Sequence, residues 1–240
     1  MKIAFISDIH GNAVALEAVL ENIHQQKVDE IIVLGDIAYR GPEPKRALEM
    51  IRSLDTKVIK GNADEWILRG VEKGEVPDQA LSIMQEEQKW TVGQLDEEDI
   101  DFLRHLPTDL FLEVEHVTIH AFHATPTSLF EVVLPEATDQ QLVEKLTKIK
   151  PADLYLYGHI HKAYKRVADG KTILNLGSVG LPFDGISQAS YAIVELHQGA
   201  FSTSHVRVPY DTERVCQQYE KAQYPNKEMM KNIIITGRND

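Results

Sequence analysis

Five short apolar runs in this chain each stop just before residue types that bind metal ions. The runs occupy residues 2–6, 31–34, 58–60, 117–122 and 154–157. The polar residues that follow or end them are Asp8, His10, Asp36, Asn62, His123, His159 and His161. Buried strands appear in a sequence as short apolar runs, and open α/β sheets bind ligands beyond the carboxyl ends of their strands. The pattern therefore predicts a sheet whose strand ends converge on a two-metal site.

The length and composition allow one substantial core. A chain of 240 residues with 43% hydrophobic and 26% charged residues is expected to form a single globular domain with additions. The lone cysteine, Cys216, excludes an internal disulfide and fits a reducing compartment. The N-terminus has no signal-peptide pattern and no apolar run is long enough to span a membrane. We therefore expect a cytoplasmic protein without a membrane partner.

The charge balance limits the class of partner. The chain has 25 Lys and Arg against 37 Asp and Glu, which gives a formal net charge of −12. An acidic surface repels polyanions, so long DNA or RNA is disfavoured as a partner. A small phosphate ester remains compatible with this charge, because a pair of bound metal ions can reverse the field within its own cleft.

Strands and helices alternate in the first segment. Apolar residues recur with the spacing i, i+3, i+4, i+7 over residues 16–23 and again over residues 47–54, where Pro42 and Pro44 mark a helix start. Strand–helix–strand–helix–strand over residues 2–60 predicts parallel strands joined by right-handed crossovers.

Residues 64–110 form a polar, mostly helical segment with acidic stretches at 86–87 and 96–99. We interpret it as a solvated helical insertion. The alternative is a lid over the cleft, in which Trp66 or Trp90 would stack on a ring of the substrate.

The pattern after residue 110 is mainly β. A polar break at Glu115-His116 separates two strands, and a helix whose apolar face runs from Leu142 to Ile149 leads to a strand at 153–157. Two hairpins are expected to turn at positions 169–170 and 198–199. The tail, residues 211–240, is predicted to be helical. The expected fold is α/β: a four-layer α-β-β-α sandwich of two mixed sheets with outer helices.

The spacing of the polar residues suits two cations. Asp8 and His10 point to the same side of an extended segment, as do His159 and His161, so each pair can hold one ion. Asp36 carries two carboxylate oxygens and can bridge two ions. The remaining two candidates, Asn62 and His123, offer a neutral amide oxygen and an imidazole.

The ligand chemistry narrows the choice of metal. No sulfur ligand is present, which argues against a structural zinc knuckle. A mixed nitrogen and oxygen set suits Mn, Fe, Zn or Co. The glycines at positions 35, 61 and 158 let the backbone turn tightly before a ligand, or approach an anion closely.

Two cations roughly 3.5–4 Å apart can clamp both ends of an in-line displacement at phosphorus and lower the pKa of a bound water. A metal-activated hydroxide then replaces any side-chain nucleophile. The chain shows neither a nucleophile-elbow nor a P-loop pattern that would indicate another route.

The order of these motifs resembles the calcineurin-like metallophosphoesterase superfamily. The matching segments are Asp8-Ile9-His10, Gly35-Asp36, Gly61-Asn62-Ala63-Asp64, His123 and Gly158-His159-Ile160-His161. A later segment, Asn175-Leu176-Gly177-Ser178-Val179-Gly180, is similar to one in small bacterial phosphodiesterase-like members. The resemblance covers residue 1 to about residue 180, and five motifs in order make it highly specific. It implies a first metal held by Asp8, His10, Asp36 and His161, and a second held by Asp36, Asn62, His123 and His159.

Ala63 is a departure from the family pattern. The family usually has a histidine there, proposed as the general acid for the leaving oxygen or as a stabiliser of charge on the phosphate, and small bacterial phosphodiesterase-like members lack it too. A missing acid disfavours poor leaving groups most. We therefore expect hydrolysis of a phosphodiester or a pyrophosphate-like bond.

Several residues have a second interpretation. Asn62 can be a turn residue that accepts positive φ, although we favour a ligand. His120 competes with His123, which we favour because it ends its strand. Asp64 can orient a neighbouring ligand or cap the next helix, and capping is favoured.

Two residues are candidates for substrate binding. Asn12 is best explained as a helix N-cap, with contact to a phosphate as the alternative. Arg40 follows Asp36 and can form a bidentate clamp on a phosphate or simply be an exposed loop arginine.

The predicted function is phosphoester hydrolysis, with a phosphodiesterase favoured. Asp36 would bridge the metals and position the nucleophile, and Asn62 would hold the second metal and touch the substrate. The alternatives are a phosphatase or dinucleoside-polyphosphate hydrolase, and a non-enzymatic binding module of the same fold. The expected partner is a small, nucleotide-like phosphoester, and the sequence leaves a homo-oligomer open.

Overall fold

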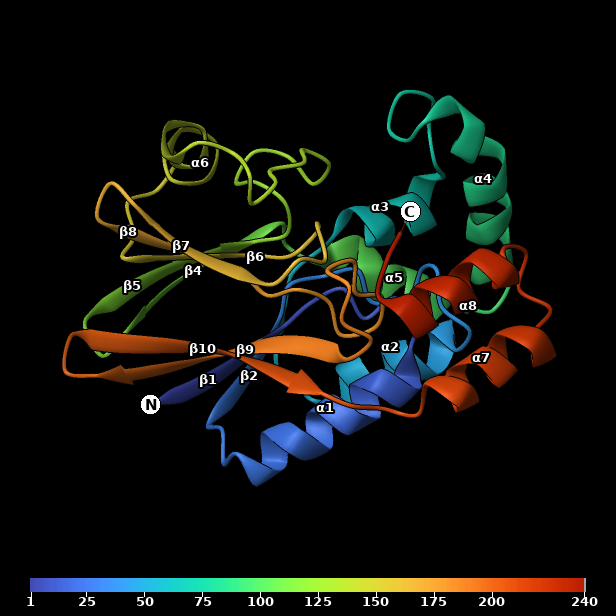
Figure 1. Cartoon of the computed structure of the whole chain (residues 1–240), viewed down its shortest axis with the longest axis horizontal. Coiled ribbons are helices and arrows are strands. Elements are labelled where there is room, and N and C mark those ends of the chain that lie inside the picture. The colour runs from blue at the N-terminus through green and yellow to red at the C-terminus, as the bar shows by residue number, and fades with distance from the viewer. Residues whose placement is uncertain (240) are drawn as a thin grey trace.

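Two five-stranded sheets packed face to face form the centre of the protein (Figure 1). The structure is a computed structural model, and it describes residues 1–239. The strands of the first sheet are β1 (Lys2–Ile6), β2 (Glu30–Val33), β3 (Lys57–Val58), β9 (Ala189–His197) and β10 (Ala200–Val208). Those of the second are β4 (Asp109–Val114), β5 (Val117–Phe122), β6 (Leu154–Tyr157), β7 (Tyr164–Ala168) and β8 (Lys171–Asn175). Their spatial orders are β10-β9-β1-β2-β3 and β4-β5-β6-β8-β7.

Both sheets are mixed. β1, β2 and β3 are parallel, whereas β9 and β10 run antiparallel to their neighbours. In the second sheet β5, β6 and β8 are parallel, while β4 and β7 run in the opposite direction. The parallel strands predicted over residues 2–60 are therefore confirmed. The β7–β8 and β9–β10 hairpins also turn where expected, at Asp169-Gly170 and Gln198-Gly199.

The described residues form eight helices, some on the outer faces of the sheets and the others beyond one end of the strands (Figure 1). They are α1 (Ala13–Gln25), α2 (Pro44–Ser53), α3 (Asn62–Arg69), α4 (Asp78–Val92), α5 (Glu97–His105), α6 (Asp139–Leu146), α7 (Thr212–Lys221) and α8 (Lys227–Thr236). Pro44 begins α2 as predicted. The helix expected to extend to Ile149 is shorter, because α6 ends at Leu146 and the backbone of Thr147 leaves the helical conformation, with φ −123°. Ile149 lies beyond this end of the helix and is 56% exposed, so its assignment to the apolar face was wrong.

The apolar side chains form one core between the sheets and further cores outside them. Phe5, Ile119 and Leu156 belong to the central core, to which both sheets contribute. A second core joins α1 and α2 to the outer face of the first sheet, and a third joins α6 to the outer face of the second. These layers confirm the predicted α-β-β-α sandwich.

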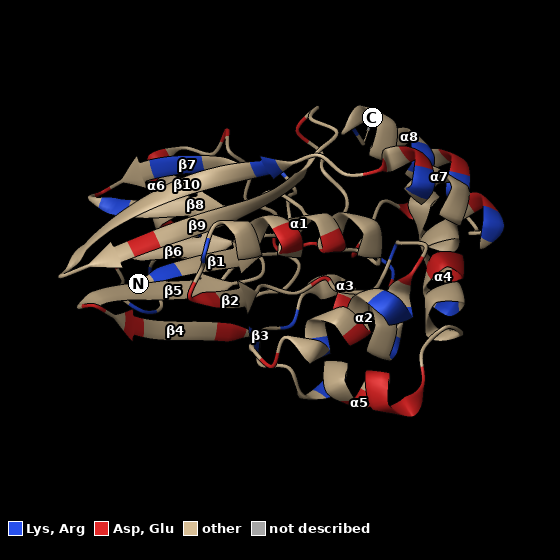
Figure 2. Ribbon diagram, turned by 90° about the horizontal axis from the view of Figure 1, so that it is seen from below, with Lys and Arg blue, Asp and Glu red and all other residues tan. Residues whose placement is uncertain are grey.

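The polar segment 64–110 contains α3, α4 and α5, although α3 already starts at Asn62 and β4 already at Asp109. Its second acidic stretch, residues 96–99, lies at the start of α5, which is red in Figure 2. Within that stretch, Asp99 is fully buried and pairs with Lys45 and Arg52 of α2 at 2.7 and 3.2 Å. This end of the insertion is therefore tied to the sandwich, and only part of its acidic surface is solvated.

The two tryptophans of the insertion serve as packing residues. Trp66 is buried beside Tyr39 and Phe130, with ring centroids 5.9 and 5.8 Å apart. Trp90 packs edge-on against Tyr224, in the turn between α7 and α8. The predicted helical tail thus consists of two helices, and it packs against the insertion.

None of the described helices combines the length and apolarity that crossing a membrane requires.

Candidate metal centre

The loops that follow the parallel strands meet at one edge of the sandwich. Backbone hydrogen bonds join the loop after β1 to the loop after β2, from the N–H of Asp8 to Gly35 and from the N–H of His10 to Asp36. The N–H of His159, after β6, donates to the Asp8 carboxylate at 3.1 Å and so connects the two sheets. The strand-end pattern read from the sequence therefore corresponds to one site in space.

Four of the predicted ligands form a compact buried group. One ligand atom from each of Asp8, His10, Asp36 and His161 lies within 4.8 Å of the others. The Nε2 atoms of His10 and His161 are 3.0 Å apart, and Nε2 of His161 lies 3.1 Å from Oδ1 of Asp8. This group can hold a metal ion.

The other three predicted ligands lie on the opposite side of Asp36. Nε2 of His123 is 3.4 Å from Oδ2 of Asp36 and 2.9 Å from Oδ1 of Asn62. The same amide oxygen is 2.7 Å from Nδ1 of His159. Oδ2 of Asp36 is also 3.6 Å from Nε2 of His10, so a single carboxylate oxygen faces both groups.

The histidine rings are oriented for cation binding. Backbone carbonyls of Tyr39 and Leu181 accept hydrogen bonds from Nδ1 of His10 and His161, at 2.8 and 2.6 Å. A proton on each Nδ1 leaves a lone pair on each Nε2, and these two lone pairs face each other. Two facing lone pairs repel each other, and a cation bound between the two Nε2 atoms removes this repulsion. The donor set therefore fits a bound metal.

A further sign of fit is the ring of His159. With Nδ1 directed at Asn62, its Nε2 atom is buried and has no hydrogen-bond partner among the described residues. With the proton on Nε2, the lone pair of Nδ1 faces the amide oxygen of Asn62 at 2.7 Å, so Nδ1 is the atom of this ring that can bind a metal ion beside Asn62.

Most of the candidate ligands have an uncommon backbone conformation. Asp8, His10, Asp36, His159 and His161 all lie in the left-handed region, with φ between 47° and 68°. Such residues cost on the order of 1–3 kcal/mol each and persist where the surrounding structure imposes them. Their concentration in a single cluster supports a functional site.

Two of the glycines noted in the sequence allow ligand loops to touch. A Cβ atom on Gly61 would lie 2.1 Å from Oδ1 of Asp36, and one on Gly158 would lie 2.5 Å from Oδ2 of Asp8. The backbone at these two glycines therefore lies in close contact with the side chains of other candidate ligands.

Asp64 has both of the roles considered for it. Its carboxylate accepts the N–H of Gly61, which precedes α3, at 2.9 Å. It also accepts the N–H groups of Asp36 and Ile37 at 2.8 and 2.9 Å, so it fixes the loop that carries Asp36. Burial and the charge of Asp36 raise the pKa of Asp64, and the three N–H donors oppose this rise.

Two residues near the site had no role assigned from the sequence. The Nδ2 group of Asn175 donates to the carbonyl of Gly158 at 2.6 Å, and the hydroxyl of Ser178 donates to the carbonyl of Asp8 at 2.7 Å. Both hold ligand loops in place. Their signal in the sequence was the family-like segment 175–180, whose structural purpose only the fold reveals.

The two substrate-binding candidates lie outside the cluster. Asn12 caps α1 through Oδ1 and donates to the carbonyl of Gly180 through Nδ2, so both of its side-chain groups are engaged. Nε of Arg40 lies 3.4 Å from Glu87 of α4, and the side chain is 13% exposed. His120, the competitor of His123, bonds Asp109 at the edge of the second sheet.

The cluster also shifts the ionisation of its members. Burial, reinforced by a neighbouring imidazole, lowers the pKa of His10 and of His159 to about 4, so both rings are neutral at pH 7. Burial alone would raise the pKa of Asp36, but His123 and the other imidazoles hold it well below its usual range. Burial lowers the pKa of His123, and the charge of Asp36 outweighs this and raises it to about 9.

Metal binding at pH 7 is therefore expected to release about one proton from His123, because metal ligands bind in their deprotonated form, in addition to any proton from a metal-bound water. The share from His123 should fall toward zero above pH 9, where His123 is already neutral in the metal-free protein, so the total release should be smaller at pH 10 than at pH 7. Calorimetric titration with Mn²⁺ in buffers of different ionisation enthalpy measures the number of protons. Equal proton release at pH 7 and pH 10 would contradict this assignment.

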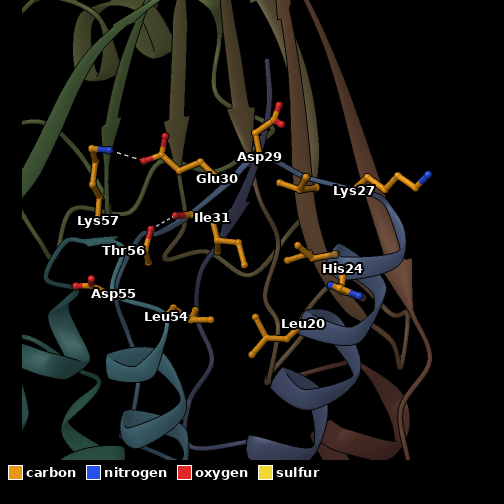
Figure 3. A pocket seen from close by; sticks show the side chains of 12 residues that line it. Leu20, His24, Lys27, Asp29, Glu30, Ile31, Leu54, Asp55, Thr56 and Lys57 are labelled. Atoms are coloured by element: carbon orange, nitrogen blue, oxygen red, sulfur yellow. Dashed lines mark hydrogen bonds and ion pairs between the residues drawn. The ribbon is translucent and has the colours of Figure 1, made fainter.

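A large groove on the described surface lies away from the metal centre. Figure 3 shows this groove of about 820 Å³ between the end of α1 and residues 54–57, with Glu30 and Ile31 in its wall. Glu30 and Lys57 start β2 and β3, whereas Asp36 and Asn62 follow the opposite ends of the same strands. Size alone therefore does not identify the reactive site.

Known proteins resemble this chain in sequence and in fold. Residues 1–199 match the model of the calcineurin-like phosphoesterase superfamily domain. An uncharacterized protein of Methanocaldococcus jannaschii is 31% identical, with 98% of both chains covered. The phosphodiesterase YfcE of Escherichia coli is 26% identical over 81% of this chain and 88% of its own. The crystal structure of a metallophosphoesterase from Sphaerobacter thermophilus has a TM-score of 0.79 and 26% identity, with 99% of both chains covered.

The fold and the buried Asp/His cluster are those of a metal-dependent phosphoesterase. The chain belongs to the calcineurin-like phosphoesterase superfamily, which confirms the resemblance found in the sequence.

Proposed function

We propose that this protein hydrolyses phosphodiester or pyrophosphate-like bonds with a pair of metal ions. The observation that carries the proposal is the position of Asp36. Its Oδ2 atom is 3.6 Å from Nε2 of His10 and 3.4 Å from Nε2 of His123, so one carboxylate can serve both groups of ligands.

The residues divide between two ions as the family resemblance implies. Asp8, His10 and His161 would hold the first ion, Asn62, His123 and His159 the second, and Asp36 both. When bound, the ions would lower the pKa of water and neutralise charge on phosphate oxygens. The nitrogen and oxygen donors suit Mn, Fe, Zn or Co.

The protein side of the mechanism rests on Asp36 and its neighbours. Oδ1 of Asp36 accepts the N–H of Ala63 at 2.8 Å, which fixes the carboxylate plane and aims Oδ2 between the two groups. Asn62 would hold the second ion and contact the phosphate. The side chain of Ala63 is fully buried and has no ionisable proton, so it cannot assist a poor leaving group. This supports a diester, and the phosphodiesterase YfcE among the relatives supports it further.

A substrate panel tests this preference. The metal-loaded protein should hydrolyse bis(p-nitrophenyl) phosphate with a kcat/KM at least about tenfold above that for a simple alkyl monoester, because the aryl oxygen leaves without protonation. Chelation should abolish turnover, and added Mn²⁺ should restore it. Equal or greater activity on alkyl monoesters would refute the diester preference. Full metal loading without turnover of any ester would favour the non-enzymatic alternative.

A further inference from the structure

A cavity of about 740 Å³ adjoins the metal centre, a volume in the usual range for small-molecule sites. His159, one of the candidate ligands, forms part of its wall. Phe183 forms another part and stacks on His161, with ring centroids 4.2 Å apart. The N–H of Phe183 also donates to the carbonyl of His161 at 3.1 Å. The cavity therefore reaches one candidate ligand, His159, directly, and Phe183 in its wall packs against another, His161.

The cavity wall carries an excess of positive charge in an otherwise acidic protein. Lys162 and Arg238 line it, and within residues 1–239 neither has a carboxylate at salt-bridge distance. The carboxylate in the wall, Asp184, is already engaged in a two-contact pair with Arg207. In a chain of net charge −12, two cations beside the metal centre without a carboxylate partner among residues 1–239 favour an anionic ligand.

The C-terminal tail brings Arg238 to this position through defined contacts. Gly237 ends α8 with φ 66°, and its carbonyl accepts the N–H of Gly185 at 2.8 Å. A Cβ atom on Gly237 would lie 2.7 Å from the backbone nitrogen of Ile186, so the two segments are in close contact. Arg238 lies outside residues 1–199, the part that matches the family model.

The same cavity has an apolar side. Val132 and Leu134 line it and are 59% and 42% exposed, and the ring of Phe183 adjoins them in the wall. Ligand sites typically combine apolar walls with a few polar groups that fix orientation. The wall thus offers an apolar surface beside a cationic one.

We propose that this cavity binds the part of the substrate beyond the reacting phosphate, and that it selects substrates with a second anionic group next to an apolar ring system, as in a nucleoside diphosphate. Lys162 and Arg238 would hold the second phosphate, and Leu134 and Phe183 would contact the base. The inference builds on the proposed function, because it places the reacting phosphate at the metal centre.

Binding of non-hydrolysable ligands tests the inference without turnover. The Mn²⁺-loaded protein is titrated calorimetrically with α,β-methylene-ADP, AMP and methylenediphosphonate. The wild type should bind α,β-methylene-ADP at least about tenfold more tightly than AMP, since one further charge-assisted contact is worth about a factor of ten. Lys162→Gln and Arg238→Gln should each reduce this ratio several-fold. Lys165→Gln removes a lysine of β7 outside the cavity and should leave the ratio unchanged.

The apolar part is tested separately with Leu134→Ser. The substitution should weaken binding of α,β-methylene-ADP severalfold and leave that of methylenediphosphonate, which has no nucleoside, unchanged. Equal affinities for α,β-methylene-ADP and AMP, or a ratio insensitive to Lys162 and Arg238, would overturn the inference. Selective binding by a protein that hydrolyses no ester would refute the proposed function and still support the cavity's ligand preference.

Discussion

An Asp36→Asn variant is expected to lose at least one bound metal ion and on the order of 10³-fold in turnover of an aryl phosphodiester. The amide keeps the size of the side chain, and its oxygen can still accept the N–H of Ala63, now 2.8 Å from Oδ1. What disappears is the negative charge that faces His10 and His123. The protein should therefore stay folded while the shared ligand fails.

Metal content by mass spectrometry, circular dichroism and steady-state kinetics on the same sample separate these effects. The loss of charge next to His123 should also lower the pKa of that ring from about 9, which an NMR titration of the metal-free protein can follow. Full turnover by the folded variant would refute the bridging role of Asp36. As a matched control, Asp29→Asn alters a carboxylate that bonds the backbone of Lys2 at the opposite end of the first sheet, and it should leave metal binding intact.

The second large effect is expected for Asp64→Asn. Three backbone N–H groups point at the Asp64 carboxylate, and an amide cannot accept from all of them. A buried donor left without a partner costs about 1–3 kcal/mol, so a loss of about 2–4 kcal/mol in the free energy of unfolding is expected. Because two of these groups belong to the loop of Asp36, metal affinity should fall by about 10–100-fold.

Asp211→Asn is the control for this prediction. Asp211 caps α7 by accepting the N–H of Arg214 at 2.9 Å, and it lies in the tail. Its replacement should cost about 1 kcal/mol or less and leave metal affinity unchanged. Chemical denaturation and metal titration of both variants compare the two sites. Similar results for both would mean that Asp64 is only a helix cap.

Much of the site follows from local sequence. Asp8, Asp36 and Asn62 follow short apolar strands, and parallel strands place their carboxyl ends at one edge of a sheet. His123 was favoured over His120 because it ends its strand, and the structure directs His123 to Asp36 and His120 to Asp109. These outcomes depend on strand direction and alternation, which a sequence pattern reports well.

Contacts between distant segments could not be predicted in this way. Arg40 follows Asp36 and was a reasonable phosphate clamp, but it pairs with Glu87, which only the packing of the insertion brings close. Arg238 has no motif around it, and it reaches the cavity because the tail docks on Gly185. The helix at residues 139–146 was extended too far because apolar periodicity continues to Ile149, while Thr147 ends it.

The most direct test of the account is anomalous diffraction from crystals of the Mn²⁺-loaded protein. The account predicts two peaks roughly 3.5–4 Å apart, with the Asp36 carboxylate between them, three further protein ligands at each, and loss of at least one peak in Asp36→Asn. A single fully occupied peak, or no peak within reach of Asp36, would contradict it.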